Sequence, residues 1–434
     1  MSTTSALPRT LARDLASAVG RPVLVEGWVH RRRRLSAVTF LIVRDRTGLA
    51  QAVIKDPAVL AGLDSWPEET AVSVTGTVAA NAQAPGGAEI VDPAVRPLSG
   101  PSDTPVVELW RPNLDASLPV LLDHAPVTWR HPRRQAVWQI AAASLKGFRD
   151  TLAAAEFTEV QTPKIVGSST ESGANVFRLD YFGRPAYLAQ SPQLYKQTLV
   201  GVFERVFEVG PVFRAEPHDT VRHLAEYVSL DVELGFIRDH HDVIAVLRDV
   251  FAGMVDSARA HAADAVELLD LQLPTVPDEF PVIHFRDALA KLGVDPDEPD
   301  FAPEHERALG AWARETHGTD FIVVEGYPTA KRAFYTHPDP HEPRWSRSFD
   351  LLFRGLELVS GAQRLHRYED YVATLTERGE SLEPYADYVE TFRFGIPPHG
   401  GFAIGLERWV ARVVEADNIR TTTLFPRDLH RLTP

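Results

Sequence analysis

The chain has 434 residues, of which 44% are hydrophobic and 24% are charged, a composition typical of a globular protein with room for two or three domains. It contains no cysteine, which excludes disulfide bonds and thiolate metal sites, and its net charge of -14 argues against a surface built for nonspecific nucleic-acid binding. The sequence begins without an apolar leader and has no run long enough to span a bilayer, so we expect a cytoplasmic protein that does not bind membranes.

The first hundred residues predict a small closed barrel such as an OB-fold. Turn residues separate five short strand-like runs, at 23–29, 38–44, 50–54, 71–78 and 89–95. An arginine run at 31–34 precedes Phe40, and Gln51 begins the polar face of the next strand. Cations beside an aromatic ring on a barrel face are typical of single-stranded RNA binding. The alternative is a solvated arginine-rich loop with Phe40 in the core.

A proline-rich stretch at 101–132 predicts a semi-rigid hinge, so the second domain is expected over 133–434. That domain opens with apolar residues at helical spacing that lead into a strand ending at Pro163. Such a helix and edge strand suit a dimer interface, although packing in the core explains the apolar stripe equally well. The stripe consists of Val137, Ile140, Leu145, Phe148 and Leu152.

Residues 190–197 predict the start of another helix, with Ser191 as its cap and Pro192 in its first turn. This places Gln193, Lys196 and Gln197 on one helical face. Lys196 is therefore a candidate partner for an anionic substrate group. An isolated lysine is more often simply solvated.

The chemical centre of the chain is a predicted hairpin, with strands from Val206 to Phe213 and from Tyr227 to Leu234 and a polar loop between them. Arginine forks match phosphate oxygens, and carboxylates beside them suggest Mg²⁺ and a nucleotide. The alternative is a solvated hairpin with surface ion pairs. The charged residues expected on one face are Arg214, Glu216, Arg222, His223, Asp231 and Glu233.

Helices and connectors are expected over 236–318, and strand-like patterns return at 321–328, 332–336 and 349–359. Polar residues gather at the end of this run, and a glycine-rich strand from Gly395 then leads into a helix that starts near Leu406. The gathered residues, with the arginine at the start of the last helix, are Asp350, Glu357, Ser360, Arg364 and Arg408.

Three segments in this order resemble motifs 1, 2 and 3 of the class II aminoacyl-tRNA synthetases: the helix and strand ending at Pro163, the hairpin from Phe213 to Glu233, and the run from Gly400 to Arg408. Residues 190–197 and 424–428 are similar to the short, archaeal type of aspartyl-tRNA synthetase. The resemblance spans essentially the whole chain. It implies an α+β fold, with an antiparallel catalytic sheet flanked by helices, an N-terminal anticodon-binding OB-fold and a homodimer built on motif 1.

The resemblance implies that the chain joins aspartate to tRNA(Asp) with ATP and Mg²⁺, through an aspartyl-adenylate. By this resemblance, Arg214 is the catalytic residue and holds the α-phosphate, while Arg222 and His223 reach the outer phosphates. Tyr227 and Arg408 are expected to enclose the adenine. Glu216 completes the ATP site. The positions that match the family's Mg²⁺ ligands are Glu357 and Ser360.

For the amino acid, the resemblance implies that Lys196 and Arg364 clamp the side-chain carboxylate of aspartate. Asparaginyl enzymes of the family typically lack the lysine, so Lys196 favours aspartate over asparagine. A neutral amide would leave the two cations unpaired. The remaining residues implied in aspartate binding are Glu171, Gln193 and Asp231 around the ammonium group, together with Ser360.

On the barrel, Phe40 and Gln51 match the family's anticodon-stacking aromatic and base-reading glutamine. His30 and Pro85 match the residues of enzymes that charge tRNA(Asn) as well as tRNA(Asp), so the resemblance predicts a nondiscriminating enzyme with a partner amidotransferase. The alternative is that these two residues are neutral drift in a discriminating enzyme.

Three features depart from the family pattern: Ser172 and Ala362 stand where glycines are usual, and the stretch 122–131 differs from its usual sequence. They spare the expected ATP and aspartate ligands, so we expect activity to survive. They also admit a specialised duplicate, for instance one that tolerates an inhibitor resembling aspartyl-adenylate. A separate hypothesis is a paralogue that activates an amino acid or binds RNA without charging tRNA.

Overall fold

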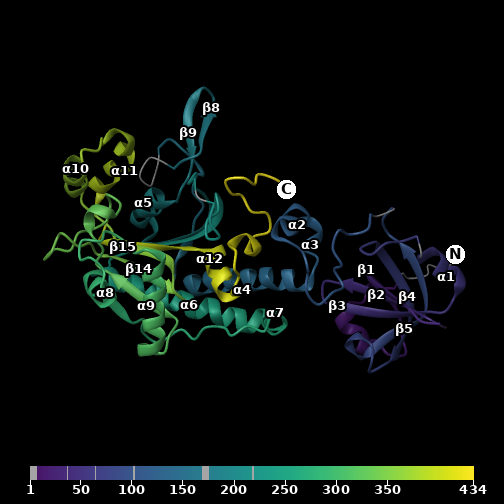
Figure 1. Cartoon of the computed structure of the whole chain (residues 1–434). Coiled ribbons are helices and arrows are strands. Elements are labelled where there is room, and N and C mark those ends of the chain that lie inside the picture. The colour runs from purple at the N-terminus through teal and green to yellow at the C-terminus, as the bar shows by residue number, and fades with distance from the viewer. Residues whose placement is uncertain (1–6, 37, 64, 101–102, 169–174, 218) are drawn as a thin grey trace. The chain divides into compact units, whose positions relative to one another are not determined.

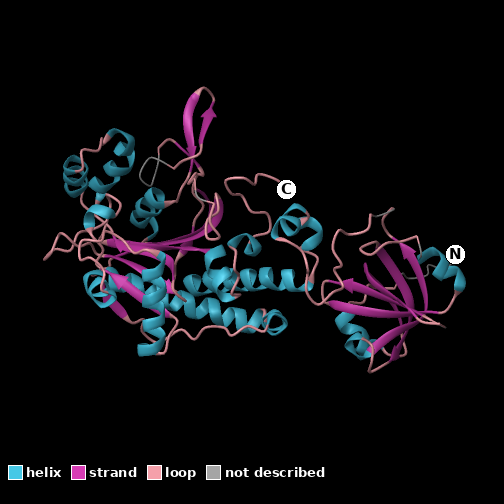
Figure 2. Cartoon of the chain, in the orientation of Figure 1, coloured by secondary structure: helices cyan, strands magenta, loops and turns pink. Residues whose placement is uncertain are grey.

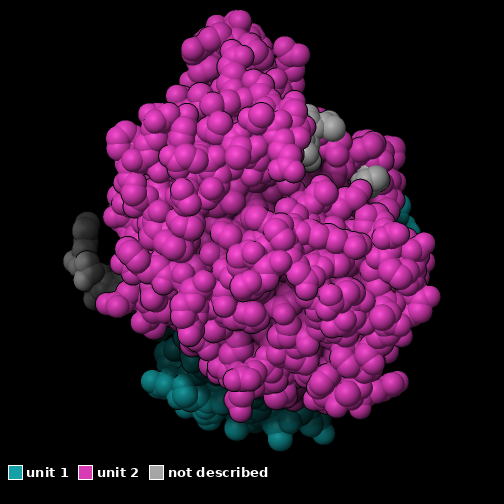
Figure 3. All heavy atoms as spheres, turned by 90° about the vertical axis from the view of Figure 1, so that its left-hand side faces the viewer, with its two compact units in different colours: residues 1–131 teal, residues 132–434 magenta. Residues whose placement is uncertain are grey.

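The computed structural model divides the chain into two units, Met1–His131 and Pro132–Pro434 (Figures 1 and 3). Structure is described for residues 7–36, 38–63, 65–100, 103–168, 175–217 and 219–434. Glu171 and Ser172 of the sequence analysis therefore lie outside the described residues. In the described part of the chain, no helix has the length and apolar character needed to cross a membrane.

The first unit contains a closed five-stranded barrel with the strand order β1-β2-β3-β5-β4, which confirms the predicted barrel. Its strands alternate between residues that fill the interior, such as Val72 and Val74, and residues that face outward. The strands are β1 (Pro22–Arg34), β2 (Thr39–Asp45), β3 (Gly48–Ile54), β4 (Ala71–Ala80) and β5 (Ala88–Pro97). The short helices of the unit are η1 (Ala12–Ala18), α1 (Pro57–Leu63), η2 (Pro85–Gly87), α2 (Leu118–Asp123) and α3 (Ala125–Thr128).

The second unit is built on an eight-stranded sheet with the order β12-β13-β14-β15-β16-β11-β10-β6. The strands from β13 to β10 pair antiparallel, as predicted, whereas the edge strands β12 and β6 pair parallel with their neighbours. The strands are β6 (Thr158–Glu159), β10 (Arg205–Phe213), β11 (Glu226–Gly235), β12 (Val282–His284), β13 (Phe321–Glu325), β14 (Ser348–Phe353), β15 (Leu356–Gln363) and β16 (His399–Gly405). A smaller sheet holds β7 (Ile165–Val166), β9 (Arg184–Leu188) and β8 (Arg178–Tyr181).

Two long helices, α4 (Pro132–Ala154) and α6 (His240–His261), pack side by side against one face of the large sheet (Figure 1). Their close contact requires Gly147 of α4, because a β-carbon there would collide with the carbonyl group of Gly253 on α6. Ile140, Phe148 and Leu152 of the predicted stripe are fully buried in this core. On the other face, β13 and β14 pack against α8 (Phe285–Leu292) and α9 (Pro303–His317), whereas β11 and β15 present polar side chains there.

The remaining helices lie around the sheet and its connections (Figure 2). They are α5 (Gln193–Phe203), α7 (Ala263–Leu269), α8 (Phe285–Leu292), α9 (Pro303–His317), α10 (Tyr368–Glu377), α11 (Ala386–Glu390) and α12 (Leu406–Val413). Short 3₁₀ turns are η3 (Thr329–Lys331), η4 (Glu383–Tyr385), η5 (Thr391–Phe394) and η6 (Ile419–Thr422).

Two local predictions were wrong. Residues 332–336 form no strand. The apolar side chains of Phe334 and Tyr335, which suggested one, pack instead in a separate cluster with α10 and α11. Helix α5 begins at Gln193 with Pro192 in the capping position, and the hydroxyl of Ser191 accepts the Gln193 N–H at 3.3 Å instead of capping the helix from its end.

Candidate active site

The side chains of β11 alternate between the core and the open face of the sheet. Leu230 and Val232 belong to the core that contacts the long helices. Because neighbouring residues of a strand point to opposite faces, Ser229, Asp231 and Glu233 project from the other side. The period of two that marked this strand in the sequence therefore directs its acids toward one site.

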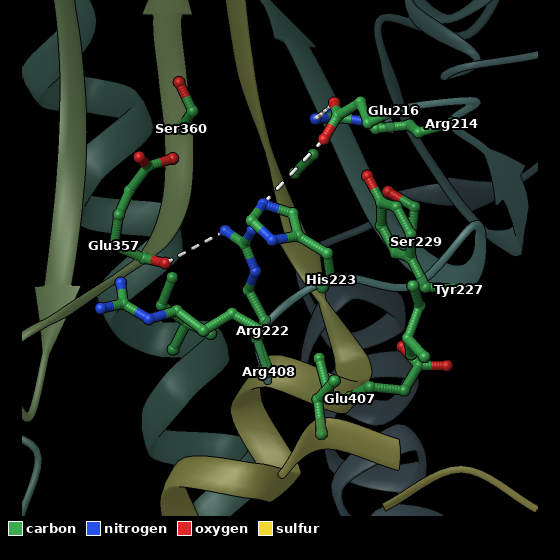
Figure 4. Close-up of a pocket in the computed structure, with 15 residues that line it drawn as sticks. Arg214, Glu216, Arg222, His223, Tyr227, Ser229, Glu357, Ser360, Glu407 and Arg408 are labelled. Atoms are coloured by element: carbon green, nitrogen blue, oxygen red, sulfur yellow. Dashed lines mark hydrogen bonds and ion pairs between the residues drawn. The ribbon is translucent and has the colours of Figure 1, made fainter. Parts of the chain in front are cut away.

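A β-bulge in β15 brings Glu357 and Ser360 to this same face. Three residues apart, they would point to opposite faces of a regular strand. The pairing of β15 with β14 shifts register in this stretch, and Leu358 and Val359 both enter the core. The extra residue restores Glu357 and Ser360 to the open side of the sheet (Figure 4).

A pocket of about 130 Å³ lies between β11, β15 and the start of α12 (Figure 4). Two ion-pair contacts among its polar groups are long: Nη1 of Arg214 is 3.7 Å from Oε1 of Glu216, and Nε2 of His223 is 4.0 Å from Oε2 of the same carboxylate. Nη1 of Arg408 donates to the carbonyl group of Glu357 at 3.4 Å. The pocket gathers every residue expected at the ATP site: Arg214, Glu216, Arg222, His223, Tyr227, Glu357 and Arg408.

Burial, together with the neighbouring Asp350, raises the pKa of Glu357 to about 7. Nη2 of Arg332 donates to Asp350 at 2.7 Å, and Nη1 of the same guanidinium donates to the hydroxyl of Ser360 at 3.3 Å. A nearby cation stabilises the ionised form of a carboxyl group whose pKa is raised. Carboxylate and hydroxyl oxygens are also the hard ligands that Mg²⁺ prefers. Glu357 and Ser360 therefore fit Mg²⁺ in both charge and chemistry.

A larger pocket, about 490 Å³, adjoins the first. Arg214, Tyr227, Ser229, Glu357 and Ser360 line both pockets, so the two form one continuous site. Residues that lie far apart in the sequence meet here. The pocket contains the described residues expected to bind aspartate, namely Gln193, Lys196, Asp231, Ser360 and Arg364.

The ammonium group of Lys196 is surrounded by oxygen atoms and only 2% exposed. Its Nζ lies 3.0 Å from Oδ1 of Asp231 and 3.4 Å from Oε2 of Glu233. The carbonyl groups of Phe402 and Val232 lie at 3.3 and 3.5 Å. Two carboxylates compensate the buried charge. Lys196 thus reaches the pocket already paired with acids of its wall, which the sequence analysis did not anticipate.

Arg364 is fixed by several acceptors. Its Nε donates to Oε1 of Glu233 at 3.0 Å, and its Nη2 donates to Oε1 of Gln193 at 3.3 Å and to the carbonyl group of Gly401 at 3.1 Å. Burial acts to raise the pKa of Glu233, but Arg364 and Lys196 outweigh it and hold that pKa below its ordinary value. Gly401 admits this arrangement because a β-carbon would collide with the Glu233 carboxylate.

A buried network behind the pocket orients Gln193. Its Nε2 donates to Oε1 of Gln197 at 2.8 Å, and the hydroxyl of Tyr388 donates to the same oxygen at 3.0 Å. Burial lowers the pKa of His399 to about 4, so its ring is neutral. Nδ1 of His399 donates to the carbonyl group of Pro397 at 2.9 Å, which leaves Nε2 to accept from Gln197 at 3.0 Å. These partners lie far apart in the sequence, and no local pattern signals them.

The outer face of the barrel carries Phe40 beside arginine side chains. Phe40 is absent from the barrel core and pairs with Arg33 across β1 and β2, with the guanidinium carbon 5.9 Å from the ring centre. The arginine run belongs to strand β1 rather than to a loop. Gln51 projects from the same face, opposite Ile42, and its Nε2 donates to Oε2 of Glu89 at 2.8 Å.

His30 and Pro85 occupy different settings in this unit. His30 lies at a β-bulge of β1 and is only 7% exposed. Burial, aided by the charge of Arg44, lowers its pKa to about 4, so the ring is neutral. Pro85 begins η2, which contacts β3, the strand of Gln51. Pro85 therefore lies beside the strand that carries Gln51, whereas His30 is part of the barrel wall.

Comparison with known proteins gives a consistent result. The family described as tRNA synthetases class II (D, K and N) matches residues 118–429, and the OB-fold nucleic acid binding domain matches residues 23–98. The Aspartate--tRNA(Asp/Asn) ligase of Deinococcus radiodurans is 45% identical and covers 99% of this chain and 100% of the relative. The enzyme of the same name from Thermus thermophilus is 44% identical and covers 98% and 100%.

Two solved structures are similar over nearly their whole length. The asparaginyl-tRNA synthetase of Pyrococcus horikoshii, complexed with asparaginyl-adenylate, has a TM-score of 0.91 and 31% identity, covering 98% of this chain and 100% of that chain. The aspartyl-tRNA synthetase of Entamoeba histolytica has a TM-score of 0.86 and 29% identity, covering 100% and 95%.

Proposed function

The chain belongs to the class II tRNA synthetases of the D, K and N family, and we propose that it is the ligase that joins aspartate to both tRNA(Asp) and tRNA(Asn). Membership of this family implies the use of ATP, an amino acid and a tRNA. The observation that carries the proposal is the continuous site, in which a pocket rich in arginine adjoins one that contains Lys196 and Arg364.

In the first step an oxygen of the aspartate α-carboxylate attacks the α-phosphorus of ATP. The bond from that phosphorus to the bridging oxygen breaks, and pyrophosphate leaves with the electron pair. Arg214 stabilises the charge that develops on the α-phosphate, and Arg222 and His223 hold the outer phosphates. Catalysis then rests on in-line positioning and charge neutralisation rather than on a covalent enzyme intermediate.

The nucleotide is held through its adenine ring and through its phosphates. Tyr227 supports one face of the adenine and Arg408 stacks on the other. Glu357 and Ser360 would hold Mg²⁺, which neutralises phosphate charge when it is bound. Glu216 remains close to Arg214 and His223, so it restrains the two side chains that meet the phosphates.

In the second step a hydroxyl of the terminal adenosine of tRNA attacks the activated carbonyl carbon of aspartyl-adenylate. The bond between that carbon and the phosphate oxygen breaks, the aspartyl group passes to the tRNA, and AMP leaves. The amino acid is held during both steps by Gln193, Asp231 and Glu171 around its ammonium group. Glu171 enters this proposal from the family resemblance alone.

Selection of aspartate over asparagine rests on the donors of Arg364 and Lys196. A carboxylate accepts hydrogen bonds at both oxygens, whereas the amide of asparagine would direct N–H donors toward these cations. Both cations keep their acceptors in the pocket wall, so the penalty falls on the amide: an N–H that faces these donors without an acceptor costs about 1–3 kcal/mol. Lys196 also balances Asp231 and Glu233, so its charge is needed even before substrate enters.

Recognition of two tRNAs is supported by the barrel and by the names of the relatives. Phe40 offers a stacking surface, Arg33 adds a cation beside it, and Gln51 supplies an amide for base reading. Pro85 and His30 are the positions proposed to relax the choice at the third anticodon base. Acceptance of tRNA(Asn) would require an amidotransferase to convert Asp-tRNA(Asn), and the enzyme would work as a homodimer through α4 and β6.

The decisive test is charging of purified tRNA(Asp) and tRNA(Asn) transcripts with labelled aspartate at matched concentrations. Comparable charging of both supports the nondiscriminating enzyme. Charging of tRNA(Asp) alone would restrict the proposal to a discriminating enzyme. Aspartate-dependent exchange of pyrophosphate into ATP without charging of either tRNA would indicate a paralogue that activates the amino acid alone.

A further inference from the structure

A third pocket, about 370 Å³, adjoins the expected ATP site and has four arginines among the residues that line it. Arg222 and Arg408 line both this pocket and the first one. Arg412 and Arg354 line the third pocket in addition, against two carboxylates, Glu415 and Asp417. The arginine side chains therefore continue outward from the place proposed for the ATP phosphates.

These arginines differ in how they are paired within the protein. Arg354 is committed to structure, since it donates to Asp320 at 3.1 Å, to the carbonyl group of Gln272 at 3.0 Å and to the carbonyl group of Arg412 at 2.9 Å. The exposed Glu415 also lies near it, with Oε1 3.4 Å from Nη1. Arg354 thus fixes the backbone at the end of α12 and neutralises one of the two acids.

The other three guanidinium groups have few partners of their own. Nη1 of Arg222 is 3.7 Å from Oε2 of Glu306, and Nη1 of Arg408 makes one long bond to the carbonyl group of Glu357. Among the described residues, the guanidinium group of Arg412 has no hydrogen bond or ion pair. Half-burial and the nearby charges of Arg222 and Arg354 lower the pKa of Arg412, although the carboxylate of Glu306 acts in the opposite direction.

The geometry of α12 relates Arg412 to Arg408. Residues four apart on a helix lie on the same face, roughly 5–6 Å apart at their β-carbons. Both side chains reach the third pocket, and Arg222 approaches from the loop between β10 and β11. Three guanidinium groups around one open space match an anion that has several phosphate oxygens.

We infer that Arg412, with Arg222 and Arg408, forms an outer subsite that receives pyrophosphate after it leaves the α-phosphorus. This inference rests on the proposed function, because it takes the ATP phosphates to lie between Arg214 and Arg222. Once the bond to the α-phosphorus has broken, pyrophosphate gains a third guanidinium partner by moving outward. Arg412 therefore favours departure of the product and, in reverse, capture of pyrophosphate from solution.

The test is aspartate-dependent exchange of labelled pyrophosphate into ATP by the full chain without tRNA. Arg412→Gln should raise the KM for pyrophosphate by roughly five- to tenfold, the range of one partly screened charge-assisted contact, and leave the KM for ATP and aspartate within about twofold. Arg412→Lys should recover part of the loss. Added salt should narrow the difference, because the contact is electrostatic and half exposed.

Arg259→Gln is the matched control, since Arg259 lies on α6 and pairs with Asp256 at 3.0 Å, away from the three pockets. Thermal unfolding of each variant checks the fold. A KM for pyrophosphate within twofold of the native value in Arg412→Gln would overturn the inference. A rise in the KM for tRNA during charging, with that for pyrophosphate unchanged, would also overturn it and assign the arginines to RNA phosphate. Failure of the native protein to catalyse any aspartate-dependent exchange would instead refute the proposed function.

Discussion

Replacing Arg364 with lysine tests the proposed carboxylate clamp, because it keeps one positive charge and removes the planar fork. The native guanidinium bonds to Glu233, Gln193 and Gly401 at 3.0, 3.3 and 3.1 Å. A lysine ammonium at this position is a compact point charge and cannot reproduce that set while also meeting a substrate carboxylate. We expect Lys196 to keep Glu233 compensated, so the variant should remain folded.

The expected loss follows from the contacts removed. Two charge-assisted hydrogen bonds to a carboxylate are worth about 1.5–3 kcal/mol each, so the transition state for adenylate formation should lose about 3–5 kcal/mol. At 1.4 kcal/mol for each factor of ten, kcat/KM for aspartate should fall roughly 100- to 3000-fold. The KM for ATP should change little, because Arg364 lines the larger pocket and not the pocket that contains the expected ATP ligands.

The assay is exchange of pyrophosphate into ATP with aspartate and ATP varied in turn, together with a thermal unfolding curve. Arg393→Lys is the control, since Arg393 is about half exposed and pairs with Glu390 at 3.0 Å outside the pocket. A folded Arg364→Lys variant whose kcat/KM for aspartate stays within fivefold of the native value would refute the clamp.

Three further predictions probe other parts of the molecule. Phe40→Ala should raise the KM for both tRNAs by roughly 5- to 100-fold, the worth of one stacked base, without changing pyrophosphate exchange; an equal loss of exchange would contradict a role confined to tRNA. Gln197→Met should raise the KM for aspartate about tenfold, because Gln193 and His399 lose a buried partner; a change in the KM for ATP alone would contradict it. Burial raises the pKa of Glu407 from 4.5 to about 7, so the folded protein binds this proton more tightly than the unfolded chain does. Above a pH of about 7 the carboxyl group is ionised in both states, and the folded protein has then lost about 3 kcal/mol of stability relative to low pH. The unfolding temperature of Glu407→Gln, relative to the native protein, should therefore rise as the pH increases from about 5 to 8, and a difference independent of pH would refute this.

Much of the fold and many candidate residues could be predicted because their signals are local. Residues of β11 alternate at a period of two, and the strand directs Asp231 and Glu233 to one face as that period requires. The five runs of the first unit close into a barrel with Phe40 outside its core, in agreement with the open-face interpretation rather than the core alternative. Local pattern and global structure agree at these positions.

The sequence did not predict features that depend on contacts between distant residues. A regular strand would separate Glu357 from Ser360, and the bulge that unites them appears only in the pairing of β15 with β14. Likewise, the partners that orient Gln193 arise from β16 and α11, and nothing next to Gln197 in the sequence indicates them. The burial of His30 has the same origin, because it follows from how the barrel wall packs.

We propose that the charge balance of the larger pocket, the expected aspartate site, explains how one scaffold can serve two different amino acids. Its buried wall contains two cations, Lys196 and Arg364, and two anions, Asp231 and Glu233. Aspartate adds one negative charge to a wall that is neutral overall. Removal of Lys196 would leave the wall with a net charge of -1, which repels a carboxylate but tolerates the neutral amide of asparagine. The Pyrococcus horikoshii asparaginyl enzyme has nearly the same fold at 31% identity, so the choice of amino acid is expected to lie in side chains such as this lysine rather than in the backbone.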